Sequence, residues 1–295
     1  MSRRQRFVRA CFGFVIAATA FVPSTQQLVV ITHADDAAVG SVTGTLSLVP
    51  AAPCVDGGSS GRRVSLFYAR TASDPDAYSS SIATIRESAA QVNAAWRSVA
   101  GKDVRWLCNS SSLVSVGNLV VTSYTIDACK SALTAKGFNR TDRIYVCFMR
   151  MSANGYGGQA QIVHNADQKV SPSPHDLGPR YASIYSISTS SSPGTLMHEF
   201  GHTIGAVQCS APHSSCPSNE TGHHHCYEES DTMCYSDGGS FFKLGGAIVN
   251  RCLNILTLAG RWDCGKDDYF NKSPAAGTYL ATHWNTYNSL FLWPK

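Results

Sequence analysis

The feature that most constrains this chain is one short segment, residues 192–205, which reads SPGTLMHEFGHTIG. Ser192 followed by Pro193 is typical of the start of a helix, and Gly205 is typical of its end. Apolar and small side chains in and just after the segment would share one face: Leu196, Phe200, Thr203, Ile204 and Val207. The segment therefore predicts an amphipathic helix that packs against a core.

The same segment carries a pattern that is typical of zinc chemistry. His198 and His202 are four residues apart, so both imidazoles project from one side of one helical turn and can meet at a single Zn²⁺ ion. Glu199 follows the first histidine and can act as a general base on water in the open coordination position. With 10 histidines in 295 residues, the pattern is expected by chance only about 0.006 times.

Downstream, residues 231–235 read DTMCY, and here the sequence resembles the metzincins, zinc peptidases with the pattern HExxHxxGxxH and a later Met-turn. The first part of that pattern is matched in register by His198, Glu199, His202 and Gly205. The resemblance covers roughly residues 64–240, with detailed motifs only in 195–235. Shorter strings also look like a group of secreted bacterial metallopeptidases.

The metzincin resemblance implies roles for two further residues. Met233 would be the methionine that lies beneath the metal without binding it, and Tyr235 would lie near the metal and the scissile carbonyl. The implied fold is a twisted sheet over two long helices, the second of which carries the histidine pair.

The chain departs from the metzincin pattern at Gln208, which stands where a third histidine belongs. Glutamine is a poor zinc ligand, so the third ligand should come from elsewhere. Archaemetzincins have a ligand histidine followed by cysteine, eight residues before the Met-turn methionine, and His225 reproduces that offset from Met233. We therefore favour His225, keep His213 as the alternative, and expect residues 206–224 to be an insertion. His223 and His224 are weaker candidates.

The N-terminus predicts export. Four arginines precede an apolar run at 10–22, which is too short to span a bilayer, and cleavage is expected after Ala20 or Ala34. Residues 1–34 are thus predicted to be a signal peptide, and no stable membrane insertion is expected after its removal. The four arginines are Arg3, Arg4, Arg6 and Arg9.

Charge and cysteine content also indicate what kind of protein this is. Without the leader, 20 basic side chains balance 20 acidic ones, so the chain has no general electrostatic reason to bind nucleic acid. Eleven cysteines leave ten once Cys11 is removed with the leader, and an even number in an exported protein indicates up to five disulfides. Two short loops, Cys209–Cys216 and Cys252–Cys264, are the pairs we predict.

The order of apolar patterns predicts an α/β fold with a mostly parallel sheet. Residues 35–62 are expected to be a linker or short propeptide, and 63–295 the functional domain, with subdomains at 63–205 and 206–295. The second subdomain should be small and irregular. Strands are expected at 64–68, 104–108, 143–149, 158–163 and 181–187, and further helices at 78–99 and 125–136.

Two further groups of residues each allow two interpretations. Three acidic residues are expected to form a solvated face, with a calcium site as the less favoured interpretation: Asp263, Asp267 and Asp268. Three glycines are expected to form a turn, with an edge strand that approaches substrate backbone as the alternative: Gly155, Gly157 and Gly158.

These observations predict a secreted zinc-dependent endopeptidase whose partners are protein or peptide substrates. Two other functions stay open. Gln208 leaves room for a secreted binding protein that has kept the fold and lost turnover, and a zinc hydrolase could act on amides that are not peptides.

Overall fold

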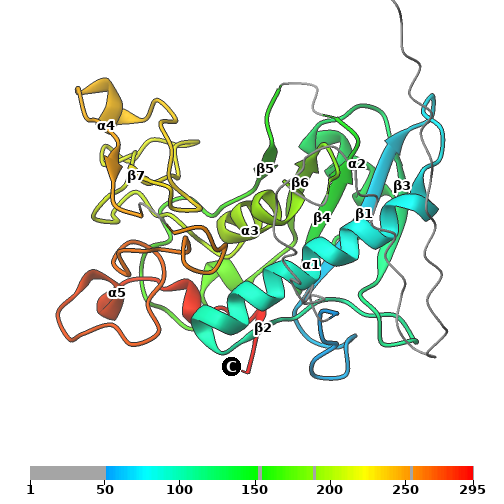
Figure 1. Cartoon of the computed structure of the whole chain (residues 1–295), viewed down its shortest axis with the longest axis horizontal. Coiled ribbons are helices and arrows are strands. Elements are labelled where there is room, and N and C mark those ends of the chain that lie inside the picture. Colours follow the sequence, from blue (N-terminus) through cyan, green and yellow to red (C-terminus); the bar gives the residue numbers. More distant parts are fainter. Residues whose placement is uncertain (1–50, 152–154, 189–190, 253–254, 295) are drawn as a thin grey trace, which may run out of the picture. The chain divides into compact units, whose positions relative to one another are not determined.

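The computed structural model describes residues 51–151, 155–188, 191–252 and 255–294 (Figure 1). The expected signal peptide and most of the expected linker lie outside these residues. Part of that linker, residues 51–62, is described, and it is tied to the domain by the disulfide Cys54–Cys108. Among the described residues, no helix combines the length and apolar character needed to cross a membrane.

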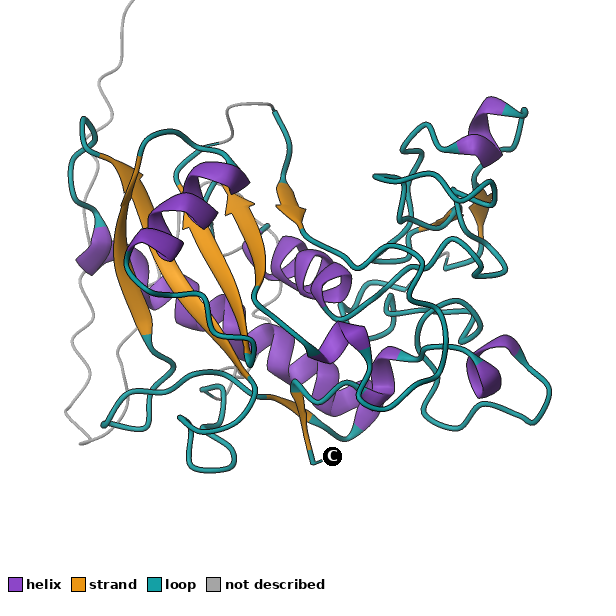
Figure 2. Ribbon diagram, turned by 180° about the vertical axis from the view of Figure 1, so that it is seen from behind, coloured by secondary structure: helices purple, strands orange, loops and turns teal. Residues whose placement is uncertain are grey.

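A five-stranded sheet is the centre of the fold, with strand order β3-β1-β4-β6-β5. The first four of these strands run parallel, and β5 joins the edge antiparallel to β6 (Figure 2). The prediction of an α/β fold with a mostly parallel sheet is therefore confirmed. The bounds are β1 Arg63–Thr71, β3 Val116–Val121, β4 Arg143–Met149, β5 Gly158–Ala160 and β6 Arg180–Tyr185.

Helices cover both faces of the sheet because the central strands are apolar on both sides. One face of β1 and β4 packs with α1 (Tyr78–Ala100) and α3 (Ser192–Thr203), and the other face packs with α2 (Ile126–Ala135). Successive side chains of β1 point to opposite faces of the sheet. Leu66 and Tyr68 pack on the α1 and α3 side, whereas Phe67 and Ala69 pack on the α2 side.

The helix α1 holds α3 in place through one buried aromatic side chain. The Trp96 ring lies with its centroid 6.1 Å from that of Phe200 on α3, and 5.1 Å and 5.6 Å from those of Trp262 and Phe270 in the C-terminal part. All four rings are almost fully buried. A large aromatic side chain at such a junction commonly contributes about 3–5 kcal/mol to the free energy of unfolding, so α3 has a rigid base.

Some predicted elements differ from the observed ones. The strand expected at 104–108 is reduced to β2 (Asp103–Val104), which pairs with β9 (Leu292–Trp293), because the chain then turns to other partners. The parallel edge strand β3 was not predicted: Gly117 and Asn118 interrupt its apolar pattern.

The part after α3 is largely irregular, as expected. Its regular elements are short: β7 (Glu228–Glu229), α4 (Ser240–Lys243), β8 (Val249–Asn250), α5 (Tyr279–Thr282) and the 3-10 turn η2 (Thr286–Asn288). A further 3-10 turn, η1 (Pro174–Asp176), lies earlier in the chain, before β6. With so little backbone pairing, covalent links and buried polar groups hold this part together.

Five disulfides join all ten cysteines of the described residues. Both predicted local pairs, Cys209–Cys216 and Cys252–Cys264, are confirmed. The remaining pairs are Cys54–Cys108, Cys129–Cys147 and Cys226–Cys234. Such a set of disulfides persists in oxidising compartments outside the cytosol.

Candidate metal centre and cleft

Helix α3 presents two histidines on one side of a single turn. His198 and His202 have ring centroids 4.7 Å apart, and their Nε2 atoms are 3.1 Å apart. The helix is held in place by Leu196, Met197 and Phe200, which are fully buried in the core. Its N-terminal turn contains Pro193, as expected.

A third imidazole comes from the irregular part of the chain. The Nε2 atom of His225 lies 3.1 Å from Nε2 of His202, and its ring centroid is 5.3 Å from that of His198. The structure thus brings His198, His202 and His225 to one point. Their roles as ligands stay predictions, and His225 is the candidate that geometry favours.

The other ring nitrogen of each α3 histidine faces a backbone carbonyl. Nδ1 of His198 donates to the Thr232 carbonyl oxygen at 2.7 Å, and Nδ1 of His202 donates to that of Ala206 at 2.9 Å. A carbonyl can only accept, so Nδ1 carries the proton in both rings and the Nε2 lone pair is free.

His225 is oriented in the same way by a carboxylate. Its Nδ1 donates to Oδ2 of Asp237 at 2.8 Å. Asp237 is itself held by the Ser215 hydroxyl at 2.8 Å and by the Gly239 backbone N–H at 2.9 Å. Burial opposes ionisation of Asp237, but these donors outweigh it and lower the pKa of its carboxyl. Asp237 was not predicted from the sequence, because its spacing from His225 matches no motif that we used.

The donor set fits a metal ion. Three unprotonated Nε2 atoms face one another and cannot hydrogen-bond among themselves, whereas a cation would accept all three lone pairs. Ligand nitrogens around tetrahedral zinc, at Zn–N distances of about 2.1 Å, are about 3.4 Å apart, close to the 3.1 Å observed here. Burial lowers the pKa of His198 to about 4 and that of His202 as well, so both rings are neutral at pH 7.

Glu199 lies next to this centre with only 4% of its surface exposed. Burial raises the pKa of its carboxyl well above the usual range. The strand β5 closely approaches it: a Cβ atom on Gly158 would lie 2.7 Å from Cγ of Glu199. Gly158 therefore belongs to the edge strand that contacts Glu199. The turn that we favoured for these glycines is wrong for Gly158.

Met233 and Tyr235 lie close to different parts of the site. Met233 is fully buried, and a Cβ atom on Gly201 of α3 would lie 2.8 Å from its sulfur, so the methionine packs against the helix that carries the histidine pair. Tyr235 is 45% exposed, with its ring centroid 4.1 Å from that of His225. Partial burial and the nearby Glu199 carboxylate raise the pKa of Tyr235 to about 12, so its hydroxyl stays a donor.

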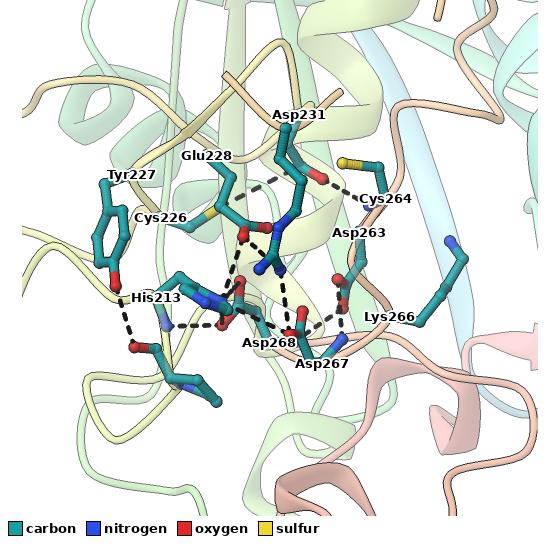
Figure 3. A network of polar contacts seen from close by, with 12 residues as sticks. His213, Cys226, Tyr227, Glu228, Asp231, Asp263, Cys264, Lys266, Asp267 and Asp268 are labelled. Atoms are coloured by element: carbon teal, nitrogen blue, oxygen red, sulfur yellow. Dashed lines mark hydrogen bonds and ion pairs between the residues drawn. The ribbon is translucent and has the colours of Figure 1, made fainter. Parts of the chain in front are cut away.

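His213, the alternative third ligand, belongs to a different cluster (Figure 3). Its Nδ1 lies 3.1 Å from both carboxylate oxygens of Asp268 and 3.4 Å from Oε1 of Glu228. The hydrogen bond to the Asp268 carboxylate is the main cause that raises the pKa of His213. Arg251 pairs with Glu228 at 2.6 Å and with Asp267 at 3.2 Å, so the carboxylates of this cluster face cationic side chains of the protein itself.

The expectation that Asp263, Asp267 and Asp268 form a solvated face is wrong for Asp263 and Asp268. Asp263 and Asp268 are 1% and 2% exposed. Oδ2 of Asp263 accepts backbone N–H groups from Asp268, Tyr269 and Phe270. The carboxylate thus replaces backbone pairing in a region without regular structure.

Gln208, which stands where metzincins have a histidine, is directed away from the histidine cluster. Its Oε1 accepts from the Ala166 backbone N–H at 3.2 Å, and its Nε2 donates to the Gly205 carbonyl at 3.1 Å. Both ends of the amide therefore have protein partners.

A cavity of about 480 Å³ lies at the candidate site, where it is lined by His198, Glu199 and Tyr235. Its lining includes Gly158 of the edge strand, and Gly155 and Gly157 from the loop before that strand. Arg261, a residue that sequence reasoning missed, also lines the cavity.

Comparison with solved structures finds a similarity to metalloproteinase-II from Bacteroides fragilis, with 15% sequence identity and a TM-score of 0.30. The similar region covers 59% of this chain and 46% of that one, so this chain spans about half the length of the solved protein. No protein-family model matches the sequence, and no curated protein matches it. The chemistry assigned to the site therefore rests on its own residues.

Proposed function

We propose that this protein is an exported zinc-dependent endopeptidase of the metzincin type. The observation that carries the proposal is the convergence of three histidine Nε2 atoms beside a buried glutamate at an open cavity. Each Nε2 is made available by an acceptor on the opposite ring nitrogen, an arrangement that is typical of metal sites.

His198, His202 and His225 would hold the ion, and Asp237 would orient His225 and strengthen it as a ligand. A bound zinc ion would lower the pKa of a water molecule and polarise the scissile carbonyl. Three protein ligands leave a coordination position open, as catalytic zinc sites require.

Glu199 would move the proton. Its carboxylate takes a proton from the attacking water as the new C–O bond forms, and gives it to the amide nitrogen as the C–N bond breaks. The surroundings of Glu199 suit this exchange, because burial raises the pKa of its carboxyl and so makes it a better proton acceptor.

The remaining groups would position the peptide. Tyr235 keeps its hydroxyl proton and can donate to the carbonyl oxygen as negative charge develops there. The strand β5 ends the strand order of the sheet, so its outer edge offers backbone groups to an extended peptide. Gly158 keeps that edge close to Glu199.

Cleavage of an unstructured protein tests the proposal. Zinc-loaded protein should cleave casein or gelatin, a chelator should abolish the cleavage, and Glu199→Gln should retain zinc while losing at least about a hundredfold in rate. A binding protein without turnover would show no chelator-sensitive cleavage by the zinc-loaded wild type. A hydrolase of other amides would cleave small amides and spare peptides.

A further inference from the structure

Arg261 is the cavity-lining side chain with a permanent positive charge. It is exposed, and within the described part of the chain no carboxylate oxygen lies within 4 Å of its guanidinium. Two other exposed arginines differ: Arg97 pairs with Asp103 at 2.8 Å, and Arg251 with Glu228 at 2.6 Å. A guanidinium without a carboxylate partner at a candidate active site is an unused anion-binding group.

The side chain of Arg261 is oriented without using its outer nitrogens. Its Nε donates to the Ser230 carbonyl oxygen. The two terminal nitrogens then remain for a ligand, and a guanidinium presents them in a fork that matches a carboxylate.

The backbone of Arg261 is tied to the histidine cluster by two hydrogen bonds in series. Thr232 donates its backbone N–H to the Arg261 carbonyl at 2.7 Å, and its own carbonyl accepts from His198 Nδ1 at 2.7 Å. The next residue, Trp262, is fully buried against Gly201, and Cys264 closes the loop by a disulfide. Arg261 therefore sits on a rigid support.

We propose that Arg261 is a specificity-determining residue that binds a substrate carboxylate next to the scissile bond. This inference rests on the proposed peptidase function. The carboxylate could be an Asp or Glu side chain within the peptide or the free C-terminus of a short peptide, and the two have the same chemistry. Among the residues that line the cavity, Arg261 supplies the permanent positive charge and Glu199 the one carboxyl group.

The test uses peptides that differ in one group. End-blocked peptides carry Glu, Gln or Lys at each position around the cleavage site, and a second set carries a free or amidated C-terminus. Wild type should prefer the carboxylate by about tenfold in kcat/KM. Arg261→Gln should reduce the preference to about onefold, Arg261→Glu should favour Lys, and the preference should decrease with added salt.

Arg140→Gln is the matched control, because Arg140 is exposed, pairs with Asp142 and lies in the turn before β4. It removes the same charge and should leave the preference unchanged. Binding of a labelled peptide to Glu199→Gln protein, read by anisotropy, gives the same Glu-to-Gln ratio without turnover.

Equal cleavage and binding of the Glu and Gln peptides by wild type would overturn the role of Arg261 and leave the proposed function intact. So would a Glu preference that survives in folded Arg261→Gln protein. Preference confined to free C-termini assigns the carboxylate to the chain end, and preference for internal Glu assigns it to the side chain. No cleavage of any peptide by zinc-loaded wild type would instead overturn the proposed function.

Discussion

A Cβ atom on Gly158 would lie 2.7 Å from Cγ and 2.8 Å from Cδ of Glu199, so the edge strand leaves room for the carboxylate only because residue 158 is glycine. Real Cβ atoms do not approach other atoms this closely. The edge of the sheet and the proposed general base therefore depend on each other directly.

Gly158→Ala should displace Glu199 and lower kcat by about tenfold or more, because a general base must lie within hydrogen-bond reach of its proton. Zinc content should stay the same, since no proposed ligand is touched. Gly157→Ala is the matched control: its Cβ atom would meet only Thr195 Oγ1, at 4.0 Å. Equal kcat values for the two variants would contradict a role for the close contact.

Removal of the Asp237 carboxylate should weaken metal binding. Asp237→Ala leaves Nδ1 of His225 without its acceptor, and loss of such a partner typically costs 10- to 100-fold in metal affinity. Competition with a chromogenic chelator measures this. Ser215→Ala, which leaves the His225–Asp237 contact in place, should have a smaller effect. Unchanged affinity in folded Asp237→Ala would argue against orientation of His225 by this carboxylate.

His175 should make stability depend on pH. It is a fully buried residue of η1 that stacks on the Trp284 ring, with ring centroids 5.3 Å apart, and burial lowers its pKa from 6.5 to about 4. Below pH 6.5 the unfolded chain takes up a proton that the folded chain excludes. The contribution is complete above pH 6.5 and is lost as pH falls towards 4, on the order of 3 kcal/mol in all.

Urea unfolding of chelator-treated protein at several pH values checks this. His175→Gln keeps a donor for the Ala166 carbonyl but has no proton to gain, so its free energy of unfolding should fall less than that of wild type between pH 6.5 and 4. Parallel curves for the two proteins would contradict the assignment.

Local patterns predicted the elements that carry strong local signals. The helix with the histidine pair, the long helix α1 and the buried strands β1 and β4 lie where apolar periodicity placed them. The strand β3 was not predicted because an edge strand needs fewer apolar residues than a central one. Its Gly117 does not form a turn; it leaves space for the Phe67 ring of the neighbouring strand. Its register is set by its neighbour β1.

The rest of the site depends on contacts between segments far apart in the chain. His225 reaches α3 across an irregular stretch held by disulfides, and Asp237 reaches His225 from twelve residues further on. No periodicity encodes such contacts. His213 could be a ligand by its residue type, but its Nδ1 contacts the carboxylates of Asp268 and Glu228. These contacts are visible only in the folded chain.

The most direct measurement is the zinc content of three purified, folded proteins by elemental mass spectrometry. Wild type and His213→Gln should each hold about one equivalent of zinc, and His225→Gln should hold much less, because two histidines bind zinc far more weakly than three ligands. Full occupancy in His225→Gln together with zinc loss in His213→Gln, or no zinc in wild type supplied with the ion, would contradict a metal centre at His198, His202 and His225.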